Sequence, residues 1–148
     1  MGYDIRFSKE NDLEDCVALS KASWPEWWSK NEKFGRQHIQ CRIKEGRSLQ
    51  ATLQNETVAF FVFGALWNKI HLEDLYVKEK HRQQGLATSL LQKILEIAKE
   101  QGFKEVVSDC DANNKVSYKW HIKNGFKEVG YIKNNWDAED SYVFAIKL

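Results

Sequence analysis

The sequence has little proline, few cysteines and no linker-like composition, and each shortage excludes a class of protein. Only one of the 148 residues is proline, Pro25, and no internal repeat or Pro/Gly/Ser-rich stretch interrupts the chain. We therefore expect a single domain over residues 1–148. The cysteines are odd in number and include no C-x-x-C, so we expect neither a disulfide framework nor a metal site. They are Cys16, Cys41 and Cys110.

Long apolar runs and an excess of charge are also missing. No stretch approaches the roughly 18 consecutive apolar residues of a membrane span, and residues 1–11 carry charges where a signal peptide is apolar. Together with the cysteine usage, this predicts a cytoplasmic protein without a membrane partner. The formal net charge is +1, which argues against a nucleic-acid-binding protein.

Hydrophobic spacing predicts an α/β fold. The stretch 57–67 is apolar on both faces, which is typical of a central strand covered on both sides. Helical spacing predicts four helices: one that stops before Pro25, one over 34–43 that ends at Gly46, one over 85–101 and one over 114–123. Residues 24–29 are expected to form an irregular link, and a long loop is expected between the last two strands. The predicted strands are 3–8, 48–53, 57–67, 70–77, 105–110, 127–133 and 141–148.

The order of these elements is β-α-α-β-β-β-α-β-α-β-β. Antiparallel strands come first and two helical crossovers follow, which predicts a twisted mixed sheet of about seven strands with about four helices on its two faces.

One segment joins a predicted strand to the longest predicted helix and has the features of an anion site. It reads Arg82-Gln83-Gln84-Gly85-Leu86-Ala87, and Lys78, Lys80 and Arg82 against Glu79 give a local net charge of +2, three positive charges less one negative. The start of a helix leaves backbone N–H groups unpaired, and its dipole favours an anion there. Glycine at position 85 allows a phosphate to approach the backbone closely. Taken by itself, the segment also fits an ordinary basic loop.

The same six residues resemble the R/Q-x-x-G-x-G/A signature of the GNAT acetyltransferase superfamily. A second similarity lies downstream, in Asn114, Ser117 and Gly125-Phe126, and the order of elements resembles the family along nearly the whole chain. The resemblance implies an acetyl-CoA-dependent N-acetyltransferase. It implies that the backbone of Leu75, Tyr76 and Val77 binds the pantetheine arm and that Asn114, with Ser117, contacts that arm or fixes its loop. Amides of Gln83, Gln84, Gly85, Leu86, Ala87 and Thr88, beside Arg82, would hold the pyrophosphate.

Acetyl transfer to an amine requires a base for the amine and an acid for the leaving thiolate. Glu73 lies on the strand that leads to the cofactor segment, and alternation places it on one face with Leu75 and Val77. We predict Glu73 as the base, with Asp74 as the second candidate. Family members often have a tyrosine acid seven residues after the asparagine, but this chain has His121 there. Tyr118, one helical turn earlier, is the other candidate acid.

The C-terminal half is similar to aminoglycoside 6'-N-acetyltransferases, which also have a Ser-Asp pair in the strand and this histidine. Their Trp-Pro after the first helix corresponds to Trp24-Pro25. Acidic residues and tryptophans suit a polycationic amine, through attraction and through cation–π contact. The candidate substrate-binding residues are Trp24, Trp27, Trp28, Asp109 and Trp136. Further acidic candidates are Glu26, Asp111, Asp137, Glu139 and Asp140.

Three functions remain open from the sequence. The first is acetylation of an aminoglycoside 6'-amine. The second is acetylation of another amine, such as a polyamine, an amino acid or a protein amine. The third is a non-catalytic acyl-CoA-binding module. Residues 141–148 and the tryptophans are candidates for the edge of a homodimer, although the sequence does not require one.

Overall fold

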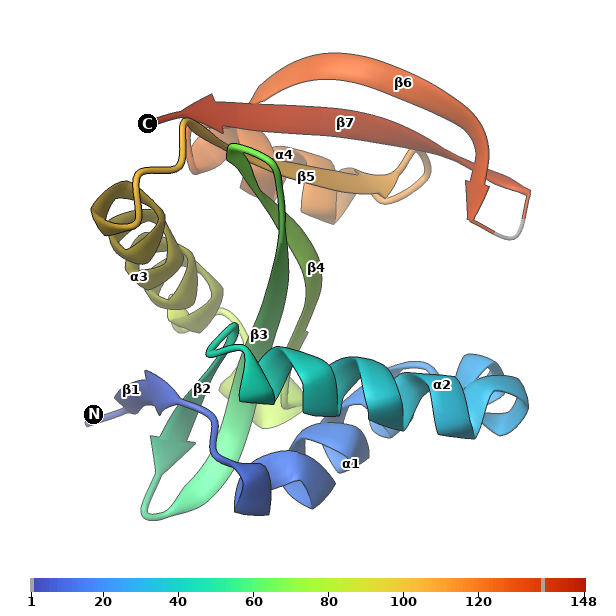
Figure 1. Ribbon diagram of the computed structural model, residues 1–148. Helices are drawn as coiled ribbons and strands as arrows, with labels where there is room; N and C mark the ends of the chain where they lie inside the picture. The colour runs from blue at the N-terminus through green and yellow to red at the C-terminus, as the bar shows by residue number, and fades with distance from the viewer. Residues whose placement is uncertain (1, 137) are drawn as a thin grey trace. The chain divides into compact units, whose positions relative to one another are not determined.

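A computed structural model describes residues 2–136 and 138–148, which contain seven strands and four α-helices (Figure 1). The strands form one mixed sheet, as the sequence predicts, and their order in it is β1-β2-β3-β4-β5-β7-β6. The strands are β1 Asp4–Phe7, β2 Ser48–Leu53, β3 Glu56–Leu66, β4 Lys69–Val77, β5 Glu105–Asp111, β6 Lys127–Trp136 and β7 Glu139–Lys147. The helices are α1 Leu13–Ser23, α2 Pro25–Lys44, α3 Leu86–Glu100 and α4 Lys115–Lys123, with 3-10 turns η1 at Glu10–Asp12 and η2 at Glu79–His81.

Contacts between residues divide the chain into two compact units. The first consists of Met1–Gly64 and Glu73–Lys93, and the second consists of Ala65–Leu72 and Ile94–Leu148. Strands β3 and β4 and helix α3 each contribute residues to both units. The prediction of a single domain stays a prediction, and each unit is described by itself.

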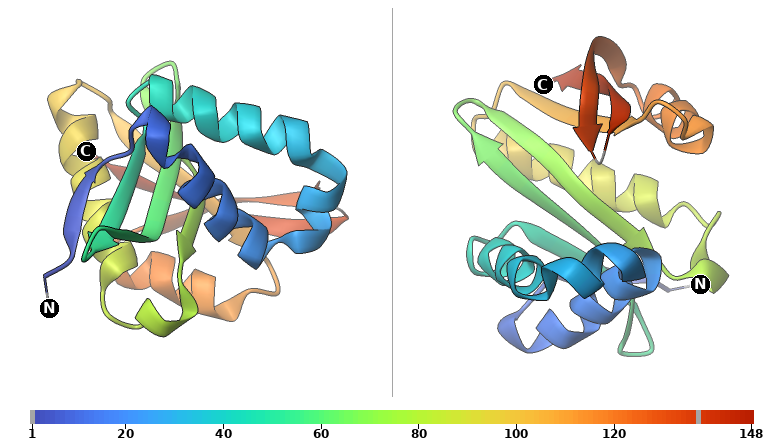
Figure 2. Two further views of the ribbon diagram at one scale, coloured as in Figure 1. Left: turned by 90° about the horizontal axis from the view of Figure 1, so that it is seen from below. Right: turned by 90° about the vertical axis from the view of Figure 1, so that its right-hand side faces the viewer.

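The first unit combines an antiparallel β-meander with two helices. Strands β1, β2 and β3 pair antiparallel, and α1 and α2 lie side by side (Figure 2). An apolar cluster joins the two helices to β3 and to the end of β4, and its largest members include Trp28, Phe60 and Tyr76. Phe60 and Tyr76 stack with their ring centroids 5.1 Å apart. The end of β4, which leads to residues 82–87, is therefore anchored to a packed core.

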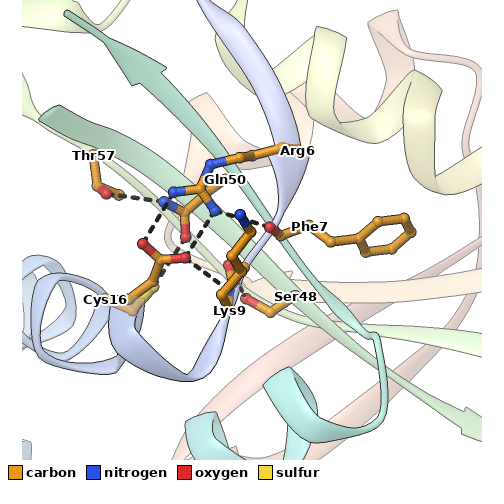
Figure 3. A network of polar contacts seen from close by, with 9 residues as sticks. Arg6, Phe7, Lys9, Cys16, Ser48, Gln50 and Thr57 are labelled. Carbon is orange, nitrogen blue, oxygen red and sulfur yellow. Dashed lines mark hydrogen bonds and ion pairs between the residues drawn. The ribbon is translucent and has the colours of Figure 1, made fainter. Parts of the chain in front are cut away.

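A polar network ties the N-terminal strand to α1 (Figure 3). Arg6 donates two hydrogen bonds to the carboxylate of Asp12, at 2.8 and 3.0 Å, and the amide of Lys9 donates a third at 2.7 Å. These bonds lower the pKa of Asp12 although its partial burial opposes the shift. Deeper in the network, Gln50 is fully buried and donates to Thr57 Oγ1 at 2.9 Å.

The second unit is built on β5. The start of β4 pairs with it in parallel, with Lys69 opposite Glu105 and His71 opposite Val107. On its other side β5 pairs antiparallel with β7, which in turn pairs with β6. Within this unit Phe126 and Phe144 are buried and their rings are in edge contact.

Two local expectations are wrong. The segment expected to be an irregular link is helical, because α2 begins at Pro25, and proline is well suited to the first helical position. A kink at Asn31, with φ −134°, interrupts this helix, and the Asn31 side chain donates to the carbonyl of Trp27 at 2.8 Å. The loop expected between the last two strands is also short, because β6 extends to Trp136 and shifts its register twice along β7.

None of the helices in the described ranges has the length and apolar character needed to cross a bilayer.

Candidate active site

The loop between β4 and α3 has the geometry of an anion cradle. Gln83 and Gly85 both adopt positive φ, at 60° and 79°, which turns the backbone sharply before the helix. The first helical bond runs from Ser89 N to Gly85 O at 2.9 Å. The amides of Leu86 and Ala87 lie in the first turn, where backbone N–H groups point along the helix axis toward its N-terminal end. A Cβ built at Gly85 has open space around it, so an incoming group can reach the backbone there.

The side chains around this cradle divide into structural and exposed groups. Lys78 forms an ion pair with Glu56, which offsets one of the predicted positive charges. Arg82 is exposed, and its Nε donates to the carbonyl of Val77 at 3.0 Å, which leaves the rest of its guanidinium at the surface. Leu86 is buried and anchors the first turn of α3 in the core. Gln83 and Gln84 are exposed beside it.

Tyr3 braces the same loop from the N-terminal end of the chain. Its hydroxyl lies 3.0 Å from Nδ1 of His81 and donates to Gln84 Oε1 at 3.1 Å. A hollow of about 580 Å³ borders the loop and is lined by Val77, Lys78 and Arg82 together with residues of α1 and the β2–β3 turn. The cradle thus lies beside a concave surface within the first unit.

Asn114 is a helix cap. Its side-chain oxygen accepts a hydrogen bond from the amide of Ser117 at 3.0 Å at the start of α4. This bond satisfies one of the unpaired amides of the first turn. Of the two roles open from the sequence, fixing the loop therefore has a visible contact, and contact with the cofactor stays a prediction.

Glu73 is held in an ion pair that the sequence reading missed. Arg42 of α2 donates to both carboxylate oxygens, at 2.6 and 2.8 Å, and His38 Nε2 lies 3.3 Å from Oε1. Burial raises the pKa of Glu73, but the bonds from Arg42 and His38 outweigh it and lower the pKa to about 2. A carboxylate with so low a pKa has little drive to take a proton from an amine. Its role as the base stays a prediction.

The strict alternation expected along β4 does not hold near Glu73. Glu73 bonds to α2, and Tyr76 also packs into the cluster built on α1 and α2. Residues three apart on a regular strand face opposite sides, so the strand changes face between them. Glu73, Asp74 and Leu75 are consecutive half-buried residues, which fits this irregularity. Burial raises the pKa of the Tyr76 phenol, and the nearby charge of Asp74 raises it further.

The two candidate acids have very different surroundings. His121 is 3% exposed, its Nδ1 donates to the carbonyl of Ser117 at 2.7 Å, and its Nε2 accepts from Ser108 at 2.8 Å. Burial lowers its pKa, which favours the uncharged ring, and both ring nitrogens already have hydrogen-bond partners. Tyr118 instead donates its hydroxyl to Glu128 at 2.7 Å, and that bond raises the pKa of its phenol. Both candidates are therefore hydrogen-bonded, but Tyr118 carries a dissociable proton and lies outside the buried core, so it is the better candidate acid.

The candidate substrate tryptophans also differ. Trp28 is 3% exposed, donates to Ser20 Oγ at 2.7 Å and lies against Gly35, so it is a core residue and offers no stacking surface. Trp27 is half-buried and makes edge contacts with Trp28 and Phe34. Trp24 is exposed. In the second unit, Trp136 donates to Asp109 at 2.9 Å, so these two candidates are joined. Asp137 lies outside the described residues.

Comparison with known proteins identifies the family. A model of the acetyltransferase (GNAT) family matches residues 13–126, which is most of the chain. The chain belongs to this family, and it is an acetyl-CoA-dependent N-acetyltransferase.

Two relatives and one solved structure illustrate the similarity. The chain is 28% identical over 128 residues to aminoglycoside N(6')-acetyltransferase type 1 of Serratia marcescens, covering 80% of this chain and 88% of the relative. It is 25% identical over 145 residues to spermidine N(1)-acetyltransferase of Thermoplasma acidophilum, covering 86% and 89%. The fold matches that of PaiA N-acetyltransferase from Thermoplasma acidophilum in complex with coenzyme A, with a TM-score of 0.83, 21% identity and complete coverage of both chains.

The residues of the cradle suit the cofactor that this family uses. The open backbone at Gly85, the amides that begin α3 and the exposed guanidinium of Arg82 are groups that bind a pyrophosphate. When bound, acetyl-CoA supplies an acetyl group activated as a thioester.

Proposed function

We propose that this protein transfers the acetyl group of acetyl-CoA to a primary amine of a small cationic substrate, with the 6'-amine of an aminoglycoside as the first candidate. The observation that supports this most strongly is the similarity to two proteins named for cationic amines, an aminoglycoside in one case and spermidine in the other. Anionic side chains attract a substrate that bears ammonium groups.

The first unit offers a surface of suitable chemistry. Trp27, Phe34 and His38 are in successive ring contact along α2, and the series ends at the carboxylate of Glu73. Flat aromatic faces suit a ring or chain that bears ammonium groups, whereas the charge of Glu73 itself is already paired with Arg42. In the second unit, Asp109 with Trp136 has the same combination of charge and indole, and we propose that it adds to substrate binding.

Each group has a proposed role. Leu75, Tyr76 and Val77 bind the pantetheine arm through their backbone, and the amides from Gln83 to Thr88 with Arg82 bind the pyrophosphate. Tyr118 provides the proton for the thiolate, in preference to the buried His121. Free thiols at Cys16, Cys41 and Cys110 support a reducing cytoplasm as the place of action.

A panel of amines tests the proposal. The purified protein is mixed with acetyl-CoA and, separately, with kanamycin-type aminoglycosides, spermidine, lysine and a peptide with a free α-amine, and release of coenzyme A thiol is followed. We expect the highest kcat/KM with an aminoglycoside. If kanamycin-type sugars are no better than spermidine or the peptide, the aminoglycoside assignment is wrong and the second class of substrate, another amine, takes its place.

The salt dependence of KM tests the electrostatic part of the proposal. Because the substrate is held by charge, KM for the best amine should rise with salt while the dissociation constant of acetyl-CoA changes less. A KM that does not respond to salt would contradict an acidic acceptor site.

A further inference from the structure

Three side chains at a spacing of four residues form one stripe along α2. They are Phe34, His38 and Arg42, and residues four apart lie on the same side of a helix. Phe34 stacks on His38 with ring planes 10° apart and centroids 6.3 Å apart. His38 and Arg42 both reach Glu73 on β4. The stripe lies outside the two segments that carry the GNAT resemblance, residues 82–87 and 114–126.

The carboxylate at the end of the stripe is fully engaged. Arg42 occupies both of its oxygens with bonds of 2.6 and 2.8 Å, and the side chain of Glu73 is 16% exposed. Gly64 makes room for this pair, because a Cβ there would lie 3.1 Å from Arg42 Nη2 and 3.3 Å from Glu73 Oε2. Such an arrangement keeps the carboxylate ionised and fixed in place, which is the requirement for orienting a neighbouring imidazole.

His38 is the neighbour that it orients. With Nε2 directed at Glu73 Oε1, the neutral ring carries its proton on Nε2 and its lone pair on Nδ1. The side chain of His38 is 25% exposed, so part of the ring is open to solvent. A carboxylate on one nitrogen of a histidine fixes the tautomer and makes the other nitrogen more basic.

We infer that His38 is the base that takes the proton from the substrate ammonium, and that Glu73 and Arg42 are positioning residues: Glu73 orients the imidazole, and Arg42 holds Glu73 in place. This inference rests on the proposed amine acetylation. One substrate proton passes to Nδ1 of His38 and then to water. The nitrogen lone pair forms the bond to the acetyl carbon, and the carbon–sulfur bond breaks. The acid gives its proton to the thiolate, and the second substrate proton replaces that proton on the acid. The products are the amide, neutral coenzyme A thiol and one released proton.

The charges around His38 support a base that works near neutral pH. The hydrogen bond to Glu73 raises the pKa of His38, burial and the charge of Arg42 lower it, and the charge of Asp74 raises it, with a net increase above 6.5. Phe34 covers one ring face without charge. An imidazole whose pKa is raised from its ordinary value is better suited to take a proton near neutral pH than a carboxylate with a pKa of about 2.

The pH dependence of kcat/KM separates His38 from Glu73 as the base. It is measured with whichever amine of the panel turns over, for wild type, His38→Gln, Glu73→Gln and the control His71→Gln. His71 lies on the same strand as Glu73 and is exposed, so its variant should behave as wild type. We expect His38→Gln to lose roughly 100-fold and the acidic limb of the profile. Glu73→Gln should keep a limb, moved to lower pH, because the carboxylate that raises the pKa is gone.

Two further measurements guard against misfolding and against failure of the substrate proposal. Added imidazole should restore part of the rate of His38→Ala, which a purely structural defect does not allow. NMR titration of the imidazole of His38 needs no substrate and should give a pKa above 6.5 that falls in Glu73→Gln. An intact acidic limb in His38→Gln, or a titration at or below 6.5, overturns the role of His38. Failure of aminoglycosides alone overturns only the substrate assignment, because the profile is taken with the amine that reacts.

Discussion

Arg42 and Glu73 form a two-pronged ion pair between α2 and β4, with nitrogen–oxygen distances of 2.6 and 2.8 Å. The pair joins the helix with the aromatic stripe to the strand that leads to the cofactor cradle. It also explains why a carboxylate tolerates a half-buried place on β4, because an ionised group there needs both charge and hydrogen bonds.

Removal of Arg42 should therefore destabilise the protein in a way that depends on pH. Arg42→Ala is expected to lower the free energy of unfolding by about 2 kcal/mol at pH 7, because a hydrogen-bonded charge loses its partner. Glu73 has a folded pKa of about 2 against 4.5, so its contribution is present above pH 4.5 and is lost as the pH falls toward 2. The difference from wild type should shrink over that range in urea denaturation series.

The matched control for this variant is Arg36→Ala. Arg36 lies on the same helix but pairs with the exposed carboxylates of Glu14 and Glu32, so its removal should cost less than about 1 kcal/mol. Equal losses for the two variants would contradict a special place for the Arg42–Glu73 pair.

The cofactor cradle can be tested with two glycines of equal backbone geometry. Gly85 and Gly102 stand at the two ends of α3 with φ of 79° and 82°, and a Cβ at either would meet open space. Alanine at either position should cost about 1–2 kcal/mol of stability, because both demand a left-handed conformation. Only Gly85→Ala should also weaken acetyl-CoA binding, by roughly tenfold or more, because its methyl group occupies the space of the phosphate.

Isothermal titration with acetyl-CoA, together with thermal unfolding of both variants, makes this comparison. Similar affinities for Gly85→Ala and Gly102→Ala would place the pyrophosphate elsewhere.

The sequence predicted the fold well because its signals are local. The apolar stripe of α3, the glycine that ends it and the two-faced apolar strand β3 each follow from residues adjacent in the chain or one turn apart. The start of α2 was missed because Pro25 was interpreted as a helix stop, while the same residue also suits a first helical position. The kink at Asn31 then hid the continuity of the helix from the hydrophobic pattern.

The candidate site was harder to predict because it depends on pairs far apart in sequence. Arg42 and Glu73 are 31 residues apart, and no spacing rule connects a helix residue to a strand residue. A signal was present, since Phe34, His38 and Arg42 recur every four residues, but this spacing also fits an ordinary solvated helix face. The burial of Trp28 and His121 could not be inferred from residue type, because both side chains occur in cores and in sites.

Tyr118 and Glu128 give a test of the acid. Tyr118→Phe should lower kcat by roughly 100-fold, because the thiolate loses its proton donor, and should leave the acetyl-CoA affinity unchanged. Glu128 raises the pKa of the Tyr118 phenol by accepting its hydrogen bond. Glu128→Gln should therefore lower that pKa and move the basic limb of the kcat profile to lower pH.

The sign follows from the form that is active. The protonated phenol donates, so activity is lost as the pH rises through its pKa, and a lower pKa brings that loss earlier. His121→Asn serves as the comparison, since its defect should appear in thermal stability and not in the basic limb. A Tyr118→Phe enzyme with an unchanged kcat would return the role of acid to another group.

The adjacent tryptophans Trp27 and Trp28 should separate stability from substrate binding. Trp28 is enclosed so tightly that a Cβ at Gly35 would lie 2.6 Å from its ring, and its indole donates to Ser20. Trp28→Ala should cost about 3–5 kcal/mol, as expected for a large aromatic residue removed from a core. Trp27 is half-buried and contacts Phe34 at the edge of the stripe, so Trp27→Ala should cost less stability but raise KM for the amine several-fold.

Gly35→Ala completes the comparison, because it should reproduce the stability loss of Trp28→Ala in part while Trp27 remains in place. Thermal unfolding and KM measured on the same preparations distinguish the two effects. If Trp27→Ala and Trp28→Ala prove equally unstable with the same KM, then Trp27 belongs to the core and has no part in binding the substrate.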